Sequence, residues 1–263
     1  MGGSLPLAGK QILITRGQKQ AAGFAAEIEQ IGGIPHVVPL IAFQPVHDQR
    51  EEEFLRRLEM FDWVIFTSKN GVDFFFQILS ERAVNPQKSL LAKFAVVGAK
   101  TEQALNKHGF HADFVPDRYT ADEFVRCIQN GRFRAERALI PKGNLSKESI
   151  ARALRSTGAS AEEWIVYETI FPKESEEKLV SLLNHDILDV ACFTSPSTVR
   201  HFMRVVEEHQ LKRHLTRILF ASIGPVTSKE LRQYRLPVHI CPGEYTMDAL
   251  LAEICAFYQK EET

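Results

Sequence analysis

The chain contains two similar halves, and this repeat constrains the fold more than any other feature of its 263 residues. Phe66-Thr67-Ser68-Lys69-Asn70 returns as Phe193-Thr194-Ser195-Pro196-Ser197, and Gly98-Ala99-Lys100-Thr101 returns as Gly224-Pro225-Val226-Thr227. Ser68 and Ser195 are 127 residues apart, and Thr101 and Thr227 are 126 residues apart. A period this long is typical of a duplicated domain, because solenoid repeats run about 20 to 50 residues. We therefore expect residues 10–125 and 136–253 to be two copies of one unit.

Short apolar runs alternate with helical patterns along both halves. Residues 11–15 form a β-prone run, and the apolar residues that follow recur at helical spacing until Gly32. Trp63-Val64-Ile65-Phe66 is a continuous apolar run, which indicates a strand buried on both faces of a parallel sheet. Such alternation predicts an α/β protein with parallel sheets and right-handed crossovers.

Two long stretches, residues 35–45 and 160–172, have an extended pattern without signals for the start or end of a helix. They occupy equivalent points of the two halves. If they pair, they form a two-stranded hinge, and the domains are not the sequence halves. The predicted domains are then residues 1–40 plus 171–263 and residues 43–167, with hinge strands at about 36–45 and 163–172. Two similar domains of this kind would create one cleft, and clefts between domains are favoured ligand sites.

Composition excludes several classes of function. The net charge of −1 provides no excess of cations for binding nucleic acid. The four cysteines form no C-x-x-C pair, and the nine histidines show no metal-ligand spacing, so no metal site is predicted. The sequence has neither a signal-peptide pattern nor an apolar run of membrane length, which predicts a cytoplasmic protein without membrane contact.

Hydroxyl side chains or glycines follow most of the predicted strands, at the edge where parallel sheets bind ligands. Helix N-termini at such an edge present N–H groups to anions, but Ser and Thr at these positions also cap helices. Both interpretations remain open for each residue. Basic residues lie next to several of these positions, namely Arg16, Lys69, Lys100, Arg118, Lys142, Arg200 and Lys229. Together they predict a site for carboxylates.

The common nucleotide motifs are missing, since neither G-x-G-x-x-G nor a P-loop occurs. Tyr167 is the only tyrosine in the two extended stretches. Its phenol is suited to donating a hydrogen bond or acting as a weak acid, whereas its alternative role is that of a half-buried strand residue.

In order and spacing, these motifs resemble the uroporphyrinogen-III synthase family over nearly the full length of the chain. The resemblance rests on Ile14-Thr15-Arg16, Phe66 to Val72, Val97 to Thr101, Val166 to Thr169, Phe193 to Ser197 and Ile223 to Thr227. It implies two flavodoxin-like domains joined by a two-stranded ladder. It also implies a monomeric lyase that closes linear hydroxymethylbilane to uroporphyrinogen III, with loss of water and inversion of ring D through a spiro intermediate, and that needs no cofactor.

The resemblance also suggests roles for individual residues. Tyr167 is expected to assist departure of the hydroxyl group, with Thr101 and Thr227 as supporting hydrogen-bond donors. The expected contacts to the eight carboxylates of the substrate are Arg16, Thr67, Ser68, Lys69, Asn70, Lys142, Ser195 and Ser197. The implied partners are this linear tetrapyrrole and, transiently, hydroxymethylbilane synthase.

Two other functions are weighed against this one. The first is a non-catalytic paralogue that binds or senses tetrapyrroles, which retention of Tyr167, Thr101 and Thr227 disfavours. The second is a pair of receiver-like domains that bind protein partners. That function predicts acidic side chains at the strand ends for Mg²⁺, whereas these strand ends are basic and hydroxylic.

Overall fold

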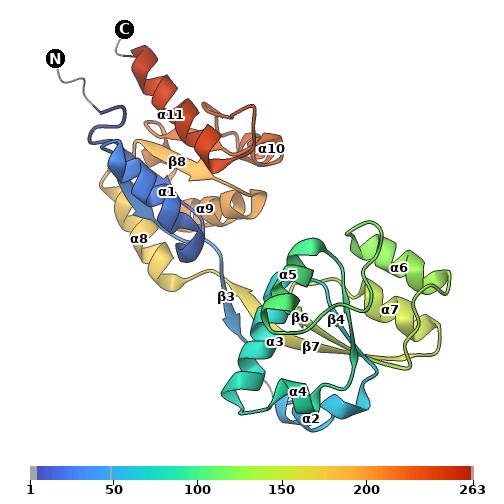
Figure 1. Ribbon diagram of the computed structural model, residues 1–263. Helices are drawn as coiled ribbons and strands as arrows, with labels where there is room; N and C mark the ends of the chain where they lie inside the picture. The colour runs from blue at the N-terminus through green and yellow to red at the C-terminus, as the bar shows by residue number, and fades with distance from the viewer. Residues whose placement is uncertain (1–4, 48, 262–263) are drawn as a thin grey trace. The chain divides into compact units, whose positions relative to one another are not determined.

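The structure, a computed structural model, describes residues 5–47 and 49–261 (Figure 1). The chain divides into two compact units. Unit 1 consists of Met1–Ala42 and Ile170–Thr263, and unit 2 of Phe43–Thr169. Unit 1 is therefore assembled from two stretches of chain that are separated in sequence by the whole of unit 2.

Unit 1 contains a parallel sheet with the strand order β2-β1-β8-β9. Its strands are β1 (Gln11–Ile14), β2 (Ile34–Val37), β8 (Val190–Phe193) and β9 (Leu219–Ser222). Ile240 adds a single parallel pairing next to β9, at Ala221. If the strands of this sheet are numbered along the chain, with the Ile240 segment as the fifth, their spatial order is 2-1-3-4-5, the order of flavodoxin-like folds.

Helices cover both faces of the unit 1 sheet because successive strand residues point to opposite faces. Ile12 and Ile14 pack against α1 (Gln18–Gln30) and α11 (Met247–Glu261). Leu13 and Phe193 face the opposite core, which includes residues from three helices and a 3-10 turn. These elements are α8 (Lys173–Asn184), α9 (Pro196–Glu208), α10 (Pro225–Gln233) and η2 (Lys212–Leu215).

Unit 2 contains a five-stranded sheet with the order β3-β7-β6-β4-β5. The strands are β3 (Ala42–Pro45), β4 (Trp63–Phe66), β5 (Lys93–Val96), β6 (Arg137–Gly143) and β7 (Ser160–Ile170). β7, β6, β4 and β5 are parallel, and Phe114 pairs with Ala95 beyond β5. β3 lies at the free edge of this sheet beside β7, where the Val46 amide donates to the Val166 carbonyl at 3.2 Å.

The unit 2 sheet is also covered on both faces. One core joins Phe66 and Leu139 to α2 (Glu51–Arg56), α3 (Lys69–Glu81) and α5 (Ala99–Lys107). The other joins Ile65 and Ile140 to α6 (Ala121–Gln129) and α7 (Ser149–Ser156). The short elements η1 (Leu58–Met60) and α4 (Pro86–Ser89) complete the unit.

The two sheets use equivalent strands of the repeat in the same order, but each draws them from both copies. Unit 1 joins β1 and β2 of the first copy to β8 and β9 of the second, and unit 2 joins β6 and β7 of the second to β4 and β5 of the first. The prediction of an α/β protein with parallel sheets is confirmed.

Two predicted elements are shorter than expected. The charged segment from Asp48 to Glu59 carries Phe54, Leu55 and Leu58 at helical spacing, which predicts one helix. The structure instead forms the short α2 followed by the turn η1, and Asp48 lies outside the described residues. Val238-His239-Ile240 is a β-prone run that predicts a strand, but of these residues only Ile240 forms a sheet pairing. Pro237 and Pro242 flank that segment, and proline cannot donate a hydrogen bond to a sheet.

None of the helices within residues 5–47 and 49–261 has both the length and the apolar character that a membrane span requires.

Candidate functional site

In both units the strands end at one edge, and the topological switch points identify where a ligand fits best. The strand order reverses between β1 and β8 in unit 1 and between β6 and β4 in unit 2. Open α/β sheets bind ligands outside the carboxyl ends of their strands at such points. The residues that follow these four strands therefore define the candidate site of each unit.

In unit 2, Tyr167 reaches this edge from β7. Its hydroxyl lies 3.3 Å from Oγ of Ser68, which follows β4. Ser68 is the N-cap of α3, where its Oγ accepts a hydrogen bond from the Gly71 amide at 3.0 Å. The phenol is thus anchored beside a helix N-terminus, where N–H groups carry a partial positive charge.

The Tyr167 ring lies in a socket of aromatic side chains and backbone. It stacks on Phe74 with the ring centroids 5.3 Å apart, and Phe43 meets it edge-on at 5.7 Å. A Cβ atom built on Gly143 would come within 2.6 Å of Tyr167 Cε2, so the ring lies directly against the glycine. Tyr167 is 7% exposed, and this packing fixes the direction of its hydroxyl.

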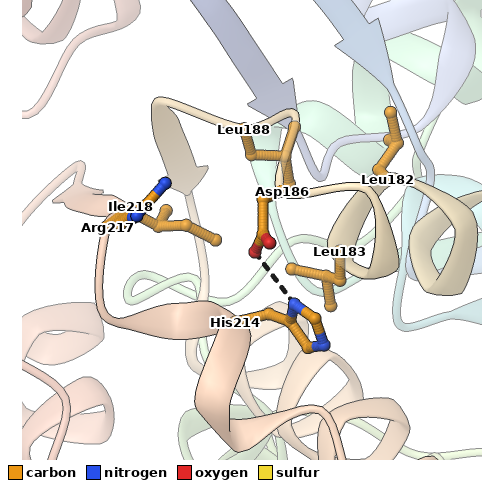
Figure 2. A pocket seen from close by; sticks show the side chains of 7 residues that line it. All are labelled: Leu182, Leu183, Asp186, Leu188, His214, Arg217 and Ile218. Atoms are coloured by element: carbon orange, nitrogen blue, oxygen red, sulfur yellow. Dashed lines mark hydrogen bonds and ion pairs between the residues drawn. The ribbon is translucent and has the colours of Figure 1, made fainter.

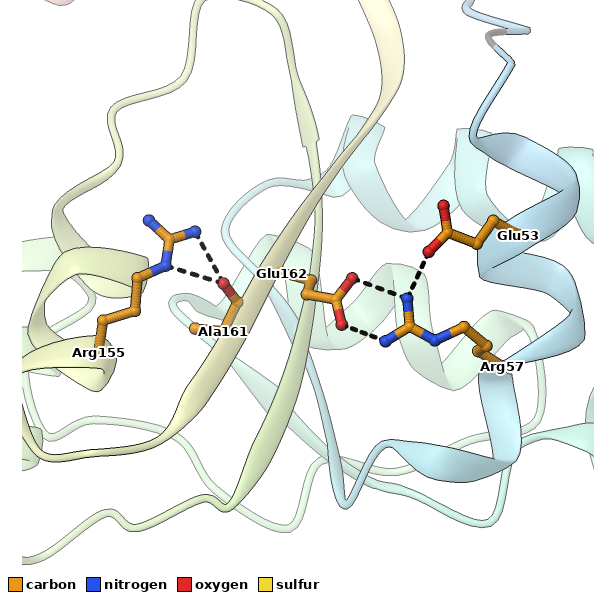
Figure 3. A network of polar contacts seen from close by, with 5 residues as sticks. All are labelled: Glu53, Arg57, Arg155, Ala161 and Glu162. Carbon is orange, nitrogen blue, oxygen red and sulfur yellow. Dashed lines mark hydrogen bonds and ion pairs between the residues drawn. The ribbon is translucent and has the colours of Figure 1, made fainter.

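Two arginines hold β7 in place from either side (Figure 3). Arg57 binds both carboxylate oxygens of Glu162, at 2.6 and 3.2 Å, and also pairs with Glu53. The hydrogen bond to Glu162 is the main cause that raises the pKa of Arg57. From α7, Arg155 donates twice to the carbonyl of Ala161 at 2.7 and 3.0 Å. The strand that carries Tyr167 is therefore fixed at its beginning.

The other unit 2 candidates differ in accessibility. Thr67 and Asn70 are half-buried at the start of α3, and the exposed Lys69 ion-pairs with Asp73 at 3.0 Å. Thr101 lies in the first turn of α5 and is buried. The edge thus offers two hydroxyls, an amide and an ammonium group beside the phenol, with Thr101 beneath the surface.

Lys142 does not have the environment expected of a carboxylate-binding residue. It lies within β6 and is 4% exposed, and its Nζ pairs with Glu163 of β7 at 2.7 Å. Its ammonium group is already neutralised inside the unit, so the structure gives it a role in joining two strands.

In unit 1, hydroxyl groups again gather at the switch point. Thr15 Oγ1 donates to the Cys192 carbonyl at 2.9 Å, which ties β1 to β8. Ser195 caps α9 by accepting from the Thr198 amide at 3.3 Å, and its Oγ lies 3.0 Å from Oγ of Ser197. Arg16 is half-buried directly after β1. These groups form a second polar edge that is built like the first.

Thr227 and Cys192 are buried at the unit 1 edge. Thr227 is in the first turn of α10 and corresponds in the repeat to Thr101. Burial raises the pKa of the Cys192 thiol to about 12, so it stays protonated and is no nucleophile. The chemistry available at this edge is therefore hydrogen bonding and charge.

Helix capping, the simpler alternative for these hydroxyls, is present at Ser68 and Ser195. A capping oxygen keeps its own O–H free to donate elsewhere, so capping does not exclude contact with a ligand. Sequence reasoning missed Gly143, Tyr119 and Tyr245 as functional candidates. The signal for both tyrosines was their recurrence 126 residues apart, whereas the contact of Gly143 had no sequence signal.

Two further features of unit 1 lie away from the strand ends. A small pocket between the α8–β8 loop and the segment before β9 contains Asp186, which accepts from His214 at 2.8 Å (Figure 2). Among the described residues, Glu176, Glu208 and His209 are grouped closely enough to hold a metal ion, at the surface of α8 and the end of α9. Neither feature contains a residue of the segments that directly follow β1 and β8, so neither belongs to the candidate site.

Comparison with known sequences gives a consistent result. A family model described as uroporphyrinogen-III synthase HemD matches residues 22–252. The chain is 31% identical to the uroporphyrinogen-III synthase of Synechococcus elongatus, over 95% of this chain and 96% of that protein. It is also 31% identical to the uroporphyrinogen-III synthase of Chlorobaculum parvum, over 89% and 93% of the two chains.

Solved structures share the fold. A mutant uroporphyrinogen III synthase from Thermus thermophilus aligns over 96% of this chain and 100% of its own, with a TM-score of 0.63 and 19% identity. The corresponding protein of Helicobacter pylori aligns over 95% and 99%, with a TM-score of 0.56 and 17% identity.

Proposed function

The chain belongs to the uroporphyrinogen-III synthase family, and we propose that it closes linear hydroxymethylbilane to uroporphyrinogen III. In this reaction the terminal hydroxyl group leaves as water and the carbon that carried it bonds to ring D. Attack by the substituted carbon of ring D gives a spiro intermediate, and its rearrangement inverts that ring. The enzyme is a cyclising lyase of tetrapyrrole biosynthesis.

The enzyme has to control which carbon of ring D attacks, and this matters more than speeding up ring closure itself. The free bilane closes without an enzyme to the type I ring, in which ring D is not inverted. A catalyst must therefore hold a flexible octacarboxylate so that the substituted carbon of ring D is the nearest nucleophile. Such geometry requires many contacts between enzyme and bilane. Their binding energy offsets the conformational entropy that the bilane loses when it is held in a folded shape.

Tyr167 is the residue proposed to assist departure of the hydroxyl group. Its phenol can donate a hydrogen bond to the leaving oxygen as the C–O bond breaks, and the proton needed for water can pass along the same contact. Support comes from the fixed ring and from Ser68, whose Oγ lies 3.3 Å from the phenol oxygen. Thr101 and Thr227, the buried hydroxyls of α5 and α10, are proposed as supporting hydrogen-bond donors.

The carboxylates are proposed to bind where the hydroxyls and helix N-termini gather. In unit 2 these groups are Thr67, Ser68, Lys69 and Asn70, and in unit 1 they are Arg16, Ser195 and Ser197. N–H groups of the first helical turn and side-chain cations both complement negative charge. Lys142 is left out of this set because Glu163 already occupies its ammonium group.

The single observation that carries this proposal is the match of the family over residues 22–252, a range that includes the residues following β4, β6 and β8. The test is incubation of purified, chelator-treated protein with freshly generated hydroxymethylbilane, followed by oxidation and separation of the uroporphyrin isomers. We expect mainly type III product, with the same rate before and after chelation. If the protein binds the bilane but only type I forms at the spontaneous rate, the non-catalytic paralogue is the correct assignment.

A cytoplasmic location and a transient contact with hydroxymethylbilane synthase are further parts of the proposal. Spontaneous closure destroys the bilane, so a handover between the two enzymes would shorten the time it spends in solution. A coupled assay tests the contact: an inactive variant of this chain added in excess should lower the type III yield if the two proteins meet. An unchanged yield would argue for free diffusion of the bilane.

A further inference from the structure

Two exposed tyrosines, Tyr119 and Tyr245, occupy equivalent positions at the strand ends of the two units. They are 126 residues apart and are 61% and 62% exposed. Within residues 5–47 and 49–261, neither ring stacks on another aromatic ring and neither phenol has a hydrogen-bond partner. Single exposed aromatics are common on protein surfaces, but here the same exposed residue recurs at the same place in both units.

Each tyrosine lies close to the glycine at the N-cap of the helix that precedes it in the chain. Gly224 is the N-cap of α10, and a Cβ atom there would come within 3.0 Å of Tyr245 Cδ1. Gly98 is the N-cap of α5, and a Cβ atom there would lie 3.5 Å from Tyr119 Cβ. The Tyr245 ring therefore rests on the backbone of Gly224, which lowers the conformational entropy that this ring loses when it binds a ligand, whereas Tyr119 approaches Gly98 at its Cβ.

The surroundings of the two tyrosines match the chemistry of a tetrapyrrole, which has flat apolar rings and acidic side chains. In unit 2, Arg118 and Lys100 are exposed beside Tyr119 and Gly98, and the described part of the chain provides no ion pair for either cation. In unit 1, Val226 follows Gly224 in the first turn of α10 and is exposed. One edge is thus aromatic and cationic, and the other is aromatic and apolar.

We propose that Tyr119 and Tyr245 contact the substrate, each holding the face of a pyrrole ring at the carboxyl edge of its own unit. This inference rests on the proposed function and extends it by naming two contacts for the apolar part of the substrate. Aromatic pairs in offset or edge-on geometry stabilise a complex beyond their buried area.

The test measures binding, so that it does not depend on turnover. Uroporphyrin III, a stable fluorescent octacarboxylate macrocycle, serves as the probe, and its Kd is measured with the wild type and with Tyr119→Ala, Tyr245→Ala, Tyr119→Phe and Tyr245→Phe. We expect each alanine variant to raise the Kd about five- to tenfold, because an aromatic contact contributes on this scale. The phenylalanine variants, which keep the ring, should stay within about twofold of the wild type.

Two exposed apolar residues at the opposite edge provide matched controls. Ile34 begins β2 in unit 1, and Leu91 precedes β5 in unit 2. Ile34→Ala and Leu91→Ala should leave the Kd unchanged. Alanine variants of both tyrosines that bind the probe as tightly as the wild type would overturn the inference, and so would a wild type that does not bind it. A wild type that binds uroporphyrin III without forming type III product would overturn the proposed function alone.

Discussion

At the scale of single residues, the account depends on how Tyr167 is held. Its ring packs between Phe74 and the backbone of Gly143, and its hydroxyl points to Ser68. Sequence reasoning identified Tyr167 because it is the phenol in an extended stretch, but it could not locate the socket. The socket depends on an irregularity in pairing, where the register passes from Lys142–Ile165 to Gly143–Tyr167 and brings the ring opposite the glycine.

Replacement of Tyr167 by phenylalanine should lower kcat for formation of type III product about ten- to hundredfold. This range follows from the loss of one hydrogen bond to a group that develops charge in the transition state. The ring remains in its socket, so the thermal unfolding midpoint should not change. Tyr234→Phe, in the half-buried tyrosine after α10, is the control and should have wild-type kcat. Equal rates for both variants would remove Tyr167 from the mechanism.

Gly143→Ala should reduce activity by moving Tyr167. The new methyl group would approach the Tyr167 hydroxyl oxygen to 2.7 Å, so the ring has to leave its present position. We expect a loss of kcat similar to that of Tyr167→Phe, and the double variant should be little worse than either single variant because both act on the same contact.

The control for this variant is Gly23→Ala, since a Cβ atom on Gly23 of α1 meets nothing within 4 Å. That variant should keep full activity and gain a little stability, because alanine favours helix over glycine by about 0.5–1 kcal/mol. Additive losses in the Gly143→Ala, Tyr167→Phe double variant would show that Gly143 does not act through Tyr167.

At the scale of elements, the sequence predicts strands and helices well where apolar residues recur with a clear period. It does not predict the environment of a residue that depends on which strand lies beside it. Lys142 is predicted to lie next to a strand end, together with the other basic residues near these positions. The strand β6 continues to Gly143, and its neighbour β7 places Glu163 within 2.7 Å of the ammonium group. The sequence alone does not reveal such a partner, because the register of β6 against β7 is a property of the folded sheet.

The ion pair between β6 and β7 should be needed for the stability of unit 2. Glu163→Gln leaves the Lys142 ammonium buried without a counter-charge, and breaking a buried pair costs about 3–5 kcal/mol. Urea unfolding followed by tryptophan fluorescence measures this loss, since the two tryptophans of the chain, Trp63 and Trp164, are both in unit 2.

Two comparisons make this measurement specific. Glu52→Gln removes one partner of the exposed pair with Arg56 in the same unit and should change the unfolding free energy by at most about 1 kcal/mol. Lys142→Met combined with Glu163→Leu should recover most of the lost stability, because no charge is left unpaired. Equal changes in the unfolding free energy for Glu163→Gln and Glu52→Gln would contradict a stabilising role of the buried pair between Lys142 and Glu163.

At the scale of the whole molecule, the duplication explains why both units carry a candidate edge. Each sheet combines strands from both sequence copies, so the copies and the compact units do not coincide. Two long extended stretches of the sequence suggest such a crossing and a pairing between the two stretches. β3 and β7, which lie in these stretches, are neighbours in the unit 2 sheet.

The continuous stretch 43–169 should fold when it is produced without the rest of the chain. It contains the complete sheet from β7 to β5 and the helices on both faces. We expect native-like circular dichroism and one cooperative urea transition reported by Trp63 and Trp164. The fragment 43–159, which lacks β7 and therefore Trp164, is the control and should be unfolded. A 43–169 fragment without a cooperative transition would show that unit 2 depends on unit 1.

The central claim is that this chain directs ring closure to the inverted isomer. The most direct test is the fraction of type III product formed from a fixed amount of hydroxymethylbilane as the protein concentration is increased. The account predicts that this fraction rises from near zero, where spontaneous closure prevails, to nearly all of the product, with an initial rate proportional to the protein. A type I product formed at the same rate at every protein concentration would contradict it.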